Sequence, residues 1–552
     1  MSSKFFTKLF FAFLLPALLL SGQALAQKRG QTNAILLYQQ GVALAKKGDY
    51  ANAIGKLQKA VEVNPKYYEA YFTLGLAFQN SQRDYEAADA FRKAITLRPN
   101  AAEPHMLLGG LLQRANDADG AIAEFREAIK LSPRSADAYS ALGFVLAATN
   151  RLAEAIEAFE TAVKLKPTLA QAHYYLGTAR YFSDDPAGAV KALGQAARLM
   201  PSNTDAHFYL GLAFEKTGDL PSAISSLRTA VKLAPKMLEA RQAMAQAYMA
   251  DANLDAAAEE FRAVVKLKPD FVQGYNDLGL VLVEKRDPDG AIAAFRKGLE
   301  IEPNNTIARN NLGMALIQKS DFVAAVAEYR KLIELTPDDA VAYYNLALAL
   351  KQQDKFSEAI AALKRATELQ PDKLPEIYYT LGVILLQQSK LDESAAAFQK
   401  AREIKPDYGE AIYTLGTVRQ QQNKIDEAIE LFRAALKFLP DAPEIHNTLG
   451  TALRQKGDIE SARIELQEAA RLNKLKTNRQ AATFAVNTGI ANLKAGRIDD
   501  AISQFQNAVK LTPDNSEAYY NLAKALKAKG KKLESAAAYR KAGELNPRVR
   551  PL

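Results

Sequence analysis

Residues 136–169 read ADAYSALGFVLAATNRLAEAIEAFETAVKLKPTL, and this 34-residue pattern decides the fold because it recurs along the chain. Ten prolines mark the recurrence, each 34 residues after the one before: Pro65, Pro99, Pro133, Pro167, Pro201, Pro235, Pro269, Pro303, Pro337 and Pro371. A single globular core has no reason to keep a fixed period. The spacing therefore predicts one small unit copied many times, with each copy packing on the next.

Three further positions are nearly constant when each repeat is numbered so that its proline is position 32. Position 8 is glycine in twelve of fifteen repeats, position 20 is alanine in thirteen, and position 24 is always aromatic or leucine. Glycine inside a helix costs roughly 1 kcal/mol relative to alanine, so its retention indicates a place where a larger side chain would cost more. We predict two helices per repeat that cross closely where position 8 faces position 20, with position 24 filling the space beside them.

The repeat, with Leu-Gly at positions 7–8, Ala at 20, an aromatic at 24, Ala at 27 and Pro at 32, resembles the tetratricopeptide repeat (TPR). The resemblance covers Ala34 to Val549 in fifteen copies. It implies an all-α fold, a right-handed superhelical TPR solenoid of antiparallel helix pairs. In that family the first helices of successive pairs line a concave groove.

The phase of the repeat divides the chain. Repeats 1–13 cover residues 34–476, an irregular junction of five extra residues covers 477–481, and repeats 14 and 15 cover 482–549. The usual proline is missing before this junction, where residues 471–476 read RLNKLK. Because nothing stops the preceding helix there, we also predict an elongated helix and a local bend.

The N-terminus has a different composition. Lys4 and Lys8 precede an apolar run from Leu9 to Leu20, and residues 24–26 read ALA, a small-residue cleavage pattern. We interpret residues 1–26 as a secretory signal peptide, so that the chain is exported to the periplasm or secreted. An uncleaved membrane anchor is the alternative, although the run is shorter than the ~20 residues that span a bilayer.

The composition excludes several classes of protein. The chain has no cysteine, which removes thiol catalysis, iron–sulfur clusters and cysteine-based zinc sites. Its net charge of +9 is spread over 552 residues without an aromatic-interleaved basic stripe, so we predict no nucleic-acid partner. All four histidines occupy position 4, which indicates packing rather than metal binding: His105, His173, His207 and His446. We predict no enzyme activity, no catalytic residue, no metal and no cofactor.

Position 6, which faces the groove in the family, separates the two parts of the chain. In the last eight repeats it carries only small hydrogen-bonding groups: Asp277, Asn311, Asn345, Thr380, Thr414, Thr448, Asn487 and Asn521. Such a ladder can pair with the backbone of an extended peptide without reading its sequence. Alternatively, asparagine is simply the family's consensus residue there. The predicted groove residues are Asn311, Asn345, Asn487 and Asn521, with Tyr344 beside them.

The earlier repeats have an aromatic group instead. Tyr174, Tyr175, Tyr181, Phe182, Phe208 and Tyr209 fall on the first helices of repeats 5 and 6. Exposed, they form a patch suited to apolar side chains or stacked sugars, and we assign Tyr174, Phe208 and Tyr209 to the groove. Alternatively, Arg180 displaces the usual apolar residue at position 11 and Tyr181 turns inward.

The function predicted from these features is a non-catalytic, exported scaffold that binds partner polypeptides in the groove. Periplasmic proteins with similar helical repeats occur in envelope-assembly and polysaccharide-export complexes, and by this analogy we expect the chain to act in such a complex. A carbohydrate-binding module that uses the aromatic patch is the alternative. The last repeat has almost no sequence after it, which suggests self-association through that repeat or docking onto another protein.

Overall fold

The structure is a computed structural model that describes residues 31–547. Within that range every regular element is an α-helix, as the repeat predicts. The predicted signal peptide, residues 1–26, lies outside the described residues. The chain divides into two compact units, Met1–Asp287 and Pro288–Leu552, called here the N-terminal half and the C-terminal half.

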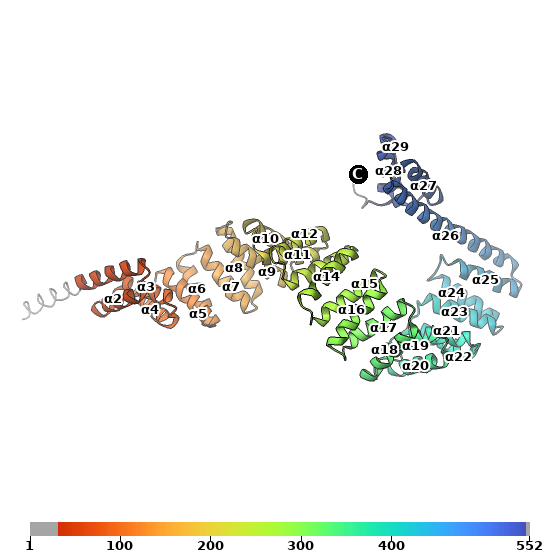
Figure 1. Cartoon of the computed structure of the whole chain (residues 1–552), viewed down its shortest axis with the longest axis horizontal. Coiled ribbons are helices and arrows are strands. Elements are labelled where there is room, and N and C mark those ends of the chain that lie inside the picture. The colour runs from red at the N-terminus through yellow and green to blue at the C-terminus, as the bar shows by residue number, and fades with distance from the viewer. Residues whose placement is uncertain (1–30, 548–552) are drawn as a thin grey trace, which may run out of the picture. The chain divides into compact units, whose positions relative to one another are not determined.

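The N-terminal half starts, within the described residues, with a helix over residues 31–46. Consecutive helices then pack against one another in chain order (Figure 1). They are α2 (Tyr50–Val63), α3 (Tyr68–Asn80), α4 (Asp84–Leu97), α5 (Ala102–Arg114), α6 (Ala118–Leu131), α7 (Ala136–Ala148), α8 (Leu152–Leu165), α9 (Ala170–Phe182), α10 (Pro186–Leu199), α11 (Thr204–Thr217), α12 (Leu220–Leu233), α13 (Leu238–Ala250), α14 (Leu254–Leu267) and α15 (Val272–Glu284).

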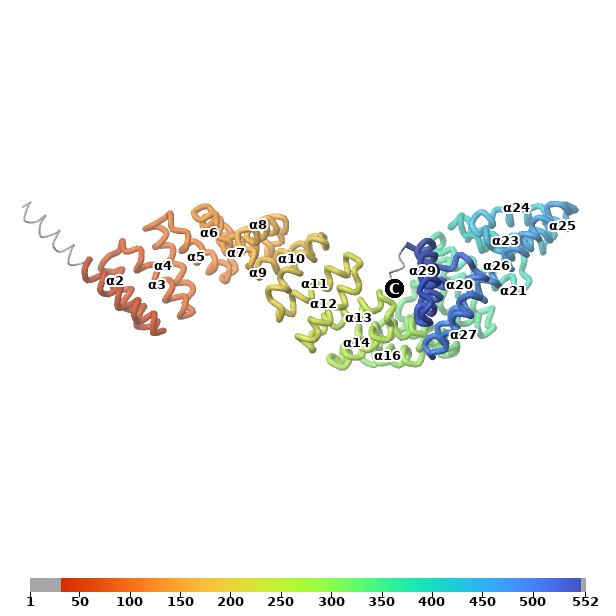
Figure 2. The backbone as a smooth tube through the Cα atoms, turned by 90° about the horizontal axis from the view of Figure 1, so that it is seen from above, coloured from red at the N-terminus to blue at the C-terminus, as the bar shows by residue number. Residues whose placement is uncertain are grey.

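The C-terminal half has the same order of paired helices (Figure 2). They are α16 (Pro288–Ile301), α17 (Thr306–Gln318), α18 (Phe322–Leu335), α19 (Ala340–Lys351), α20 (Phe356–Leu369), α21 (Pro375–Gln387), α22 (Leu391–Ile404), α23 (Gly409–Gln421), α24 (Ile425–Leu436), α25 (Pro443–Lys456), α26 (Ile459–Lys494), α27 (Ile498–Leu511), α28 (Ser516–Ala528) and α29 (Lys532–Leu545). Among residues 31–547, no helix combines the length and the apolar character that crossing a bilayer requires.

Each helix pair turns at position 15. The backbone φ there is positive in all fifteen repeats, and only Gly48, Gly218, Gly457, Gly496 and Gly530 among these residues are glycine. A residue in the left-handed region ends the first helix and lets the chain reverse. Asp or Asn then caps many of the helices, as where the Asp117 carboxylate accepts a hydrogen bond from the Gly120 backbone N–H at the start of α6.

The close crossing predicted at position 8 is present. A Cβ atom added to Gly75 would lie 2.6 Å from the Phe91 ring, and one added to Gly382 would lie 2.8 Å from the Phe398 ring. Position 20 faces the same place, since the Ser394 hydroxyl donates a 2.8 Å hydrogen bond to the Gly382 carbonyl. The residue at position 24 therefore covers the glycine directly, and position 20 packs beside it.

The junction between repeats 13 and 14 differs from the prediction. Residues 477–481 are not irregular, because they lie within α26, one helix of 36 residues that joins the second helix of repeat 13 to the first helix of repeat 14. The predicted elongated helix is thus present. Its cause is local: Lys474 occupies position 32, so the proline that ends other second helices is absent.

Candidate functional site

The first helices of successive repeats lie beside one another within each half. In the N-terminal half α5, α7, α9, α11 and α13 form one such row, and in the C-terminal half α17 contacts α19 and α23 contacts α25. Successive second helices have no contact of similar extent within the described part of either half. A stack whose first helices approach more closely than its second helices curves toward the first helices. Their shared face is the candidate site.

Position 5 of one repeat meets position 6 of the next on this face. In the C-terminal half the contact is a hydrogen bond: the Asn345 side-chain N–H donates to Asn310 Oδ1 at 2.9 Å, and the hydroxyls of Tyr413 and Thr448 are 3.2 Å apart. Side-chain polar groups therefore join successive first helices.

The predicted ladder residues occupy this face with different exposure. Asn311, Tyr344 and Asn345 are half-buried, Asn487 is exposed, and Asn521 is only 9% exposed. The Asn521 side-chain N–H donates to the Glu517 carbonyl at 3.1 Å, so this residue bonds mainly with its own helix.

Two of the three threonines of the ladder also bond with their own helices. The hydroxyls of Thr414 and Thr448 donate to the carbonyls of Glu410 and Glu444, one turn earlier in their own helices. A hydroxyl oxygen that donates its proton still has lone pairs. These two hydroxyls can therefore accept a hydrogen bond from a ligand but have no proton left to donate.

Sequence reasoning missed tyrosines that extend the polar row. Tyr379 at position 5 and Tyr408 at position 34 pack with ring centroids 5.2 Å apart, and the Lys405 ammonium lies 5.2 Å from the Tyr408 ring centroid. Burial, followed by the neighbouring Tyr379 and Glu376, raises the pKa of Tyr408 to about 12. The missed signal was the tyrosine at position 5 in three consecutive repeats, Tyr344, Tyr379 and Tyr413.

Between α9 and α11 in the N-terminal half the same contact is aromatic. Tyr174 at position 5 meets Tyr209 at position 6 of the next repeat, with ring centroids 6.4 Å apart and an interplanar angle of 60°. Tyr209 also contacts Tyr181, Phe182 and Phe208 at centroid distances of 5.9, 5.9 and 5.3 Å. These edge-to-face contacts hold one aromatic cluster across α9 and α11.

The exposure of this cluster is uneven. Tyr174, Tyr181, Phe208 and Tyr209 are half-buried against neighbouring helices, whereas Phe182 is 61% exposed. Burial, followed by the negative charge of Asp205, raises the pKa of Tyr174 to about 12. Tyr181 packs against the core, as the second interpretation of the sequence expected. Phe182 is the most exposed ring of the cluster and is therefore the most accessible to a partner.

The histidines lie away from this face, at position 4. His105 and His446 each place Nδ1 2.6 Å from a carboxylate at position 23 of the same repeat, Glu124 and Glu465. His173 places Nε2 3.0 Å from the Pro167 carbonyl. Within residues 31–547, no three His, Cys, Asp or Glu side chains are grouped so that they could hold a metal ion.

Comparison with protein families gives a consistent result. A family model of the tetratricopeptide repeat matches residues 38–102, 106–170, 174–237, 243–306 and 344–409. Further models of the same repeat match residues 313–354 and 491–530, 385–447 and 419–481, and 516–548. The matched segments together run from residue 38 to residue 548.

Individual proteins are similar over parts of the chain. An uncharacterised protein of Methanocaldococcus jannaschii is 39% identical over 54 residues, which is 10% of this chain and 63% of that protein. The crystal structure of YrrB, a TPR protein with an unusual peptide-binding site, is 27% identical and covers 36% of this chain and 99% of its own, with a TM-score of 0.33. The crystal structure of MamA is also 27% identical, over 29% of this chain and 94% of its own, with a TM-score of 0.29.

Proposed function

We propose that this chain, which belongs to the tetratricopeptide repeat family, holds an extended partner polypeptide on the face of its first helices. The family supports a protein-interaction scaffold. The observation that supports the finer proposal is the contact of position 5 with position 6 of the next repeat at three junctions, where side chains of successive first helices meet on one face.

The C-terminal half supplies the contacts to the partner's main chain. Thr414 and Thr448 keep acceptor capacity, and Asn345 uses one of its two N–H groups on Asn310. Acceptors spaced along successive helices suit the backbone N–H groups of an extended peptide, which binds without regard to its side chains. Asn311, Asn487, Asn521 and Tyr344 complete the proposed site in this half.

The N-terminal half supplies an apolar anchor. More than half of the Phe182 side chain is exposed, and its ring contacts Tyr181 and Tyr209. Tyr209 in turn contacts Tyr174 and Phe208. An aromatic edge of this kind suits an apolar side chain of the partner. In this proposal the N-terminal half binds an apolar side chain of a partner, and the C-terminal half binds the backbone of an extended segment.

The setting is part of the proposal. The apolar run and cleavage pattern of residues 1–26 support export, so the scaffold would act in the periplasm or outside the cell, in envelope assembly or polysaccharide export. Tyr539 at position 24 of repeat 15 is half-buried, whereas that position is at most 1% exposed in repeats 1–12 and 14, and this difference supports docking or self-association at repeat 15.

Affinity capture tests the proposal. The full chain is immobilised, partners are captured from an envelope extract, and the bound segment is mapped with synthetic peptides. Asn487→Leu and Thr414→Val should each weaken peptide binding severalfold, and N-methylation of the peptide backbone should weaken it further because it removes the donors. Ala327→Leu, on an exposed second-helix site of the same half, is the matched control and should bind as the unchanged chain does.

A carbohydrate ligand is the competing outcome. Retention of the chain on immobilised glycans that is lost with Phe182→Ala and Tyr174→Ala, together with peptide binding indifferent to Asn487→Leu and Thr414→Val, would replace the scaffold with a sugar-binding module.

A further inference from the structure

Repeat 14 exposes a surface that the other internal repeats bury. Position 3 of the first helix is buried in repeats 2–13 and 15: Ala70, Pro104, Ala138, Ala172, Ala206, Ala240, Gly274, Ala308, Ala342, Ile377, Ala411, Ile445 and Ala518. In repeat 14 this position is Phe484, a large apolar side chain that is 73% exposed. Only the first repeat resembles it, with Leu36 53% exposed. Phe484 thus lies where the chain would normally receive the preceding repeat.

Repeat 13 exposes the opposite surface. The large residue at position 24 is at most 1% exposed in repeats 1–12 and in repeat 14. The exceptions are Leu466 in repeat 13 and Tyr539 in repeat 15, which are both half-buried. Within residues 31–547, no further repeat stacks on repeat 15. Repeat 13 has the same exposure although two repeats follow it.

The continuous helix α26 explains both surfaces. In a regular junction the next first helix folds back onto the preceding second helix, as Gly274 at position 3 does: a Cβ there would lie 3.1 Å from Val264 and 3.2 Å from Val265, at positions 27 and 28. Because α26 does not turn, repeat 14 does not stack on repeat 13. The equivalent residues in repeat 13 are Ala469 and Ala470, and Ala470 is exposed.

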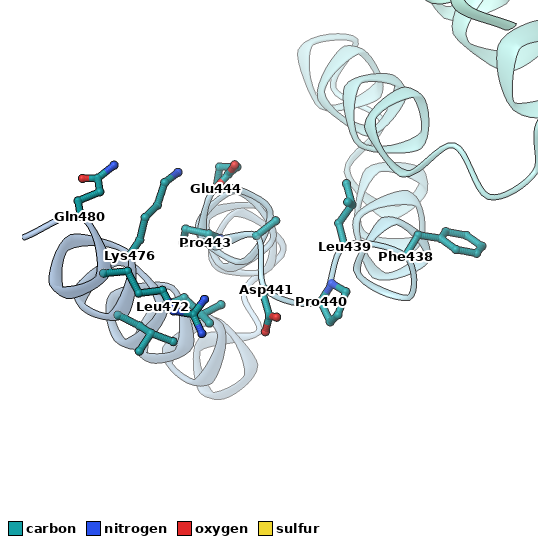
Figure 3. Close-up of a pocket in the computed structure, with 12 residues that line it drawn as sticks. Phe438, Leu439, Pro440, Asp441, Pro443, Glu444, Leu472, Lys476 and Gln480 are labelled. Carbon is teal, nitrogen blue, oxygen red and sulfur yellow. The ribbon is translucent and has the colours of Figure 1, made fainter. Parts of the chain in front are cut away.

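A cavity of about 550 Å³ lies on the open side of repeat 13 (Figure 3). Its apolar wall includes Leu439 from the loop between α24 and α25, Pro443 from the start of α25, and Leu472 and Leu475 from α26. Figure 3 shows Lys476 and Gln480 of α26 extending on the same side as Glu444 of α25. The volume is large enough for the side chains of another polypeptide.

We propose that a second copy of this chain covers these surfaces. The face of repeat 14 that carries Phe484 in each copy packs on the face of repeat 13 that carries Leu466 and Ala470 in the other copy. Every regular junction of the chain joins the position 3 face of one repeat to the face of the preceding repeat that carries positions 27 and 28. Phe484 is larger than the usual alanine at position 3, and the small Ala469 and Ala470 on the receiving face leave room for it. Reciprocal exchange satisfies both faces in both copies with one two-fold axis near the middle of α26.

The charges beside the cavity agree with self-pairing. Asp441 and Glu444 lie on the α25 side, and Lys476 and Arg479 lie on the α26 side. An interface that meets its own copy through a two-fold axis needs both signs of charge, so that the acids of one copy can meet the bases of the other. A patch of one sign would repel itself.

Sedimentation velocity on the full chain tests the pairing. The unchanged chain is expected to form a dimer as its concentration rises. Phe484→Asp should abolish the dimer without unfolding the chain, because the side chain is already exposed in the single copy. Leu533→Asp is the matched control, since Leu533 is an exposed apolar residue on repeat 15, and this variant should still dimerise. A chain that stays monomeric, or a dimer lost with Leu533→Asp but kept with Phe484→Asp, overturns the proposal.

Two further variants show which copy provides each face. The chain has no cysteine, so Phe484→Cys and Ala470→Cys can be made in separate chains and mixed under oxidising conditions. A disulfide between the two chains is expected. A disulfide within one chain that carries both cysteines, formed in the monomer, would instead show that repeat 14 folds back on its own repeat 13.

A third experiment restores the regular repeat at this junction. Lys474→Pro returns proline to position 32, so it should break α26, stack repeat 14 on repeat 13 of the same chain and leave a folded monomer. A dimer that survives this change contradicts a role for the continuous helix.

Discussion

The junction between α9 and α11 and the junction between α17 and α19 use the same two positions for different chemistry. In the first, position 5 and position 6 of the next repeat are Tyr174 and Tyr209, whose rings meet edge to face. In the second they are Asn310 and Asn345, joined by a 2.9 Å hydrogen bond. The helices that carry these side chains have the same core, in which a large residue at position 24 covers a glycine at position 8 in α9, α11 and α17 and Ala347 in α19.

This difference shows that the core and the first-helix face vary independently. The core contacts lie within one helix pair, so they are preserved whichever side chains join one first helix to the next. Aromatic contacts release apolar surface from water, whereas an amide pair exchanges hydrogen bonds with water for bonds of similar strength. The N-terminal junction should therefore contribute more to stability, and the C-terminal junction should leave more polar capacity for a ligand.

The largest effect is expected for the aromatic junction. Tyr209→Ala removes contacts with four neighbouring rings and should lower the free energy of unfolding by roughly 2–4 kcal/mol, measured by urea denaturation. Hydrogen exchange should localise the loss to α9 and α11. Tyr85→Ala, at a tyrosine that is 82% exposed, is the control and should change stability by less than ~0.5 kcal/mol. Equal losses in the two variants would remove the distinction between the junctions.

The shared core should respond equally in both halves. Gly75→Ala and Gly382→Ala each place a Cβ within 2.8 Å of a ring and should cost about 1–3 kcal/mol in thermal or urea unfolding. Gly194→Ala and Gly543→Ala meet nothing within 4 Å and should be neutral or stabilise by up to ~1 kcal/mol. A cost confined to one half would show that the cores are not equivalent.

Alkaline pH should lower the folding stability of the chain through one partly buried tyrosine in each half. Burial raises the pKa of Tyr174 and of Tyr408 to about 12, above the value of 10.0 for an unburied tyrosine. The unfolded chain therefore loses these protons first, so the stabilisation is complete below pH 10 and is lost as pH rises toward 12. Tyr174→Phe and Tyr408→Phe should each flatten the fall of the urea midpoint over that range. An unchanged slope would mean that neither hydroxyl is protected in the folded chain.

The smallest effect is expected for the amide junction. Asn345→Ala should cost about 1 kcal/mol, and a double-mutant cycle with Asn310→Ala should give a coupling energy of about 0.5–1.5 kcal/mol. Asn487→Ala, at an exposed position 6, provides the control and should be close to neutral. A coupling energy near zero would show that the bond between Asn310 and Asn345 does not hold the helices together.

Several features of the fold could be predicted from the repeat alone. The spacing of Gly75 and Phe91 predicted their contact, and Lys474 in place of a proline predicted that the helix would run on. The left-handed residue at position 15 was not anticipated, because Ala252 and Arg286 occupy it as well as glycine and asparagine. The junction at 477–481 was wrongly taken as irregular, since extra residues without a helix breaker can simply lengthen a helix.

The candidate site was predicted less completely. Position 6 identified Asn345, yet its partner Asn310 lies 35 residues away on another helix, and one sequence does not show which side chains meet there. The proline and glycine period by itself determined that the chain is a stack of helix pairs, because each such residue acts on its own backbone or on its own pair. Only the tertiary structure decided which groups remain available, since Phe484 is exposed and Asn521 is buried according to how neighbouring repeats pack, not according to the residue itself.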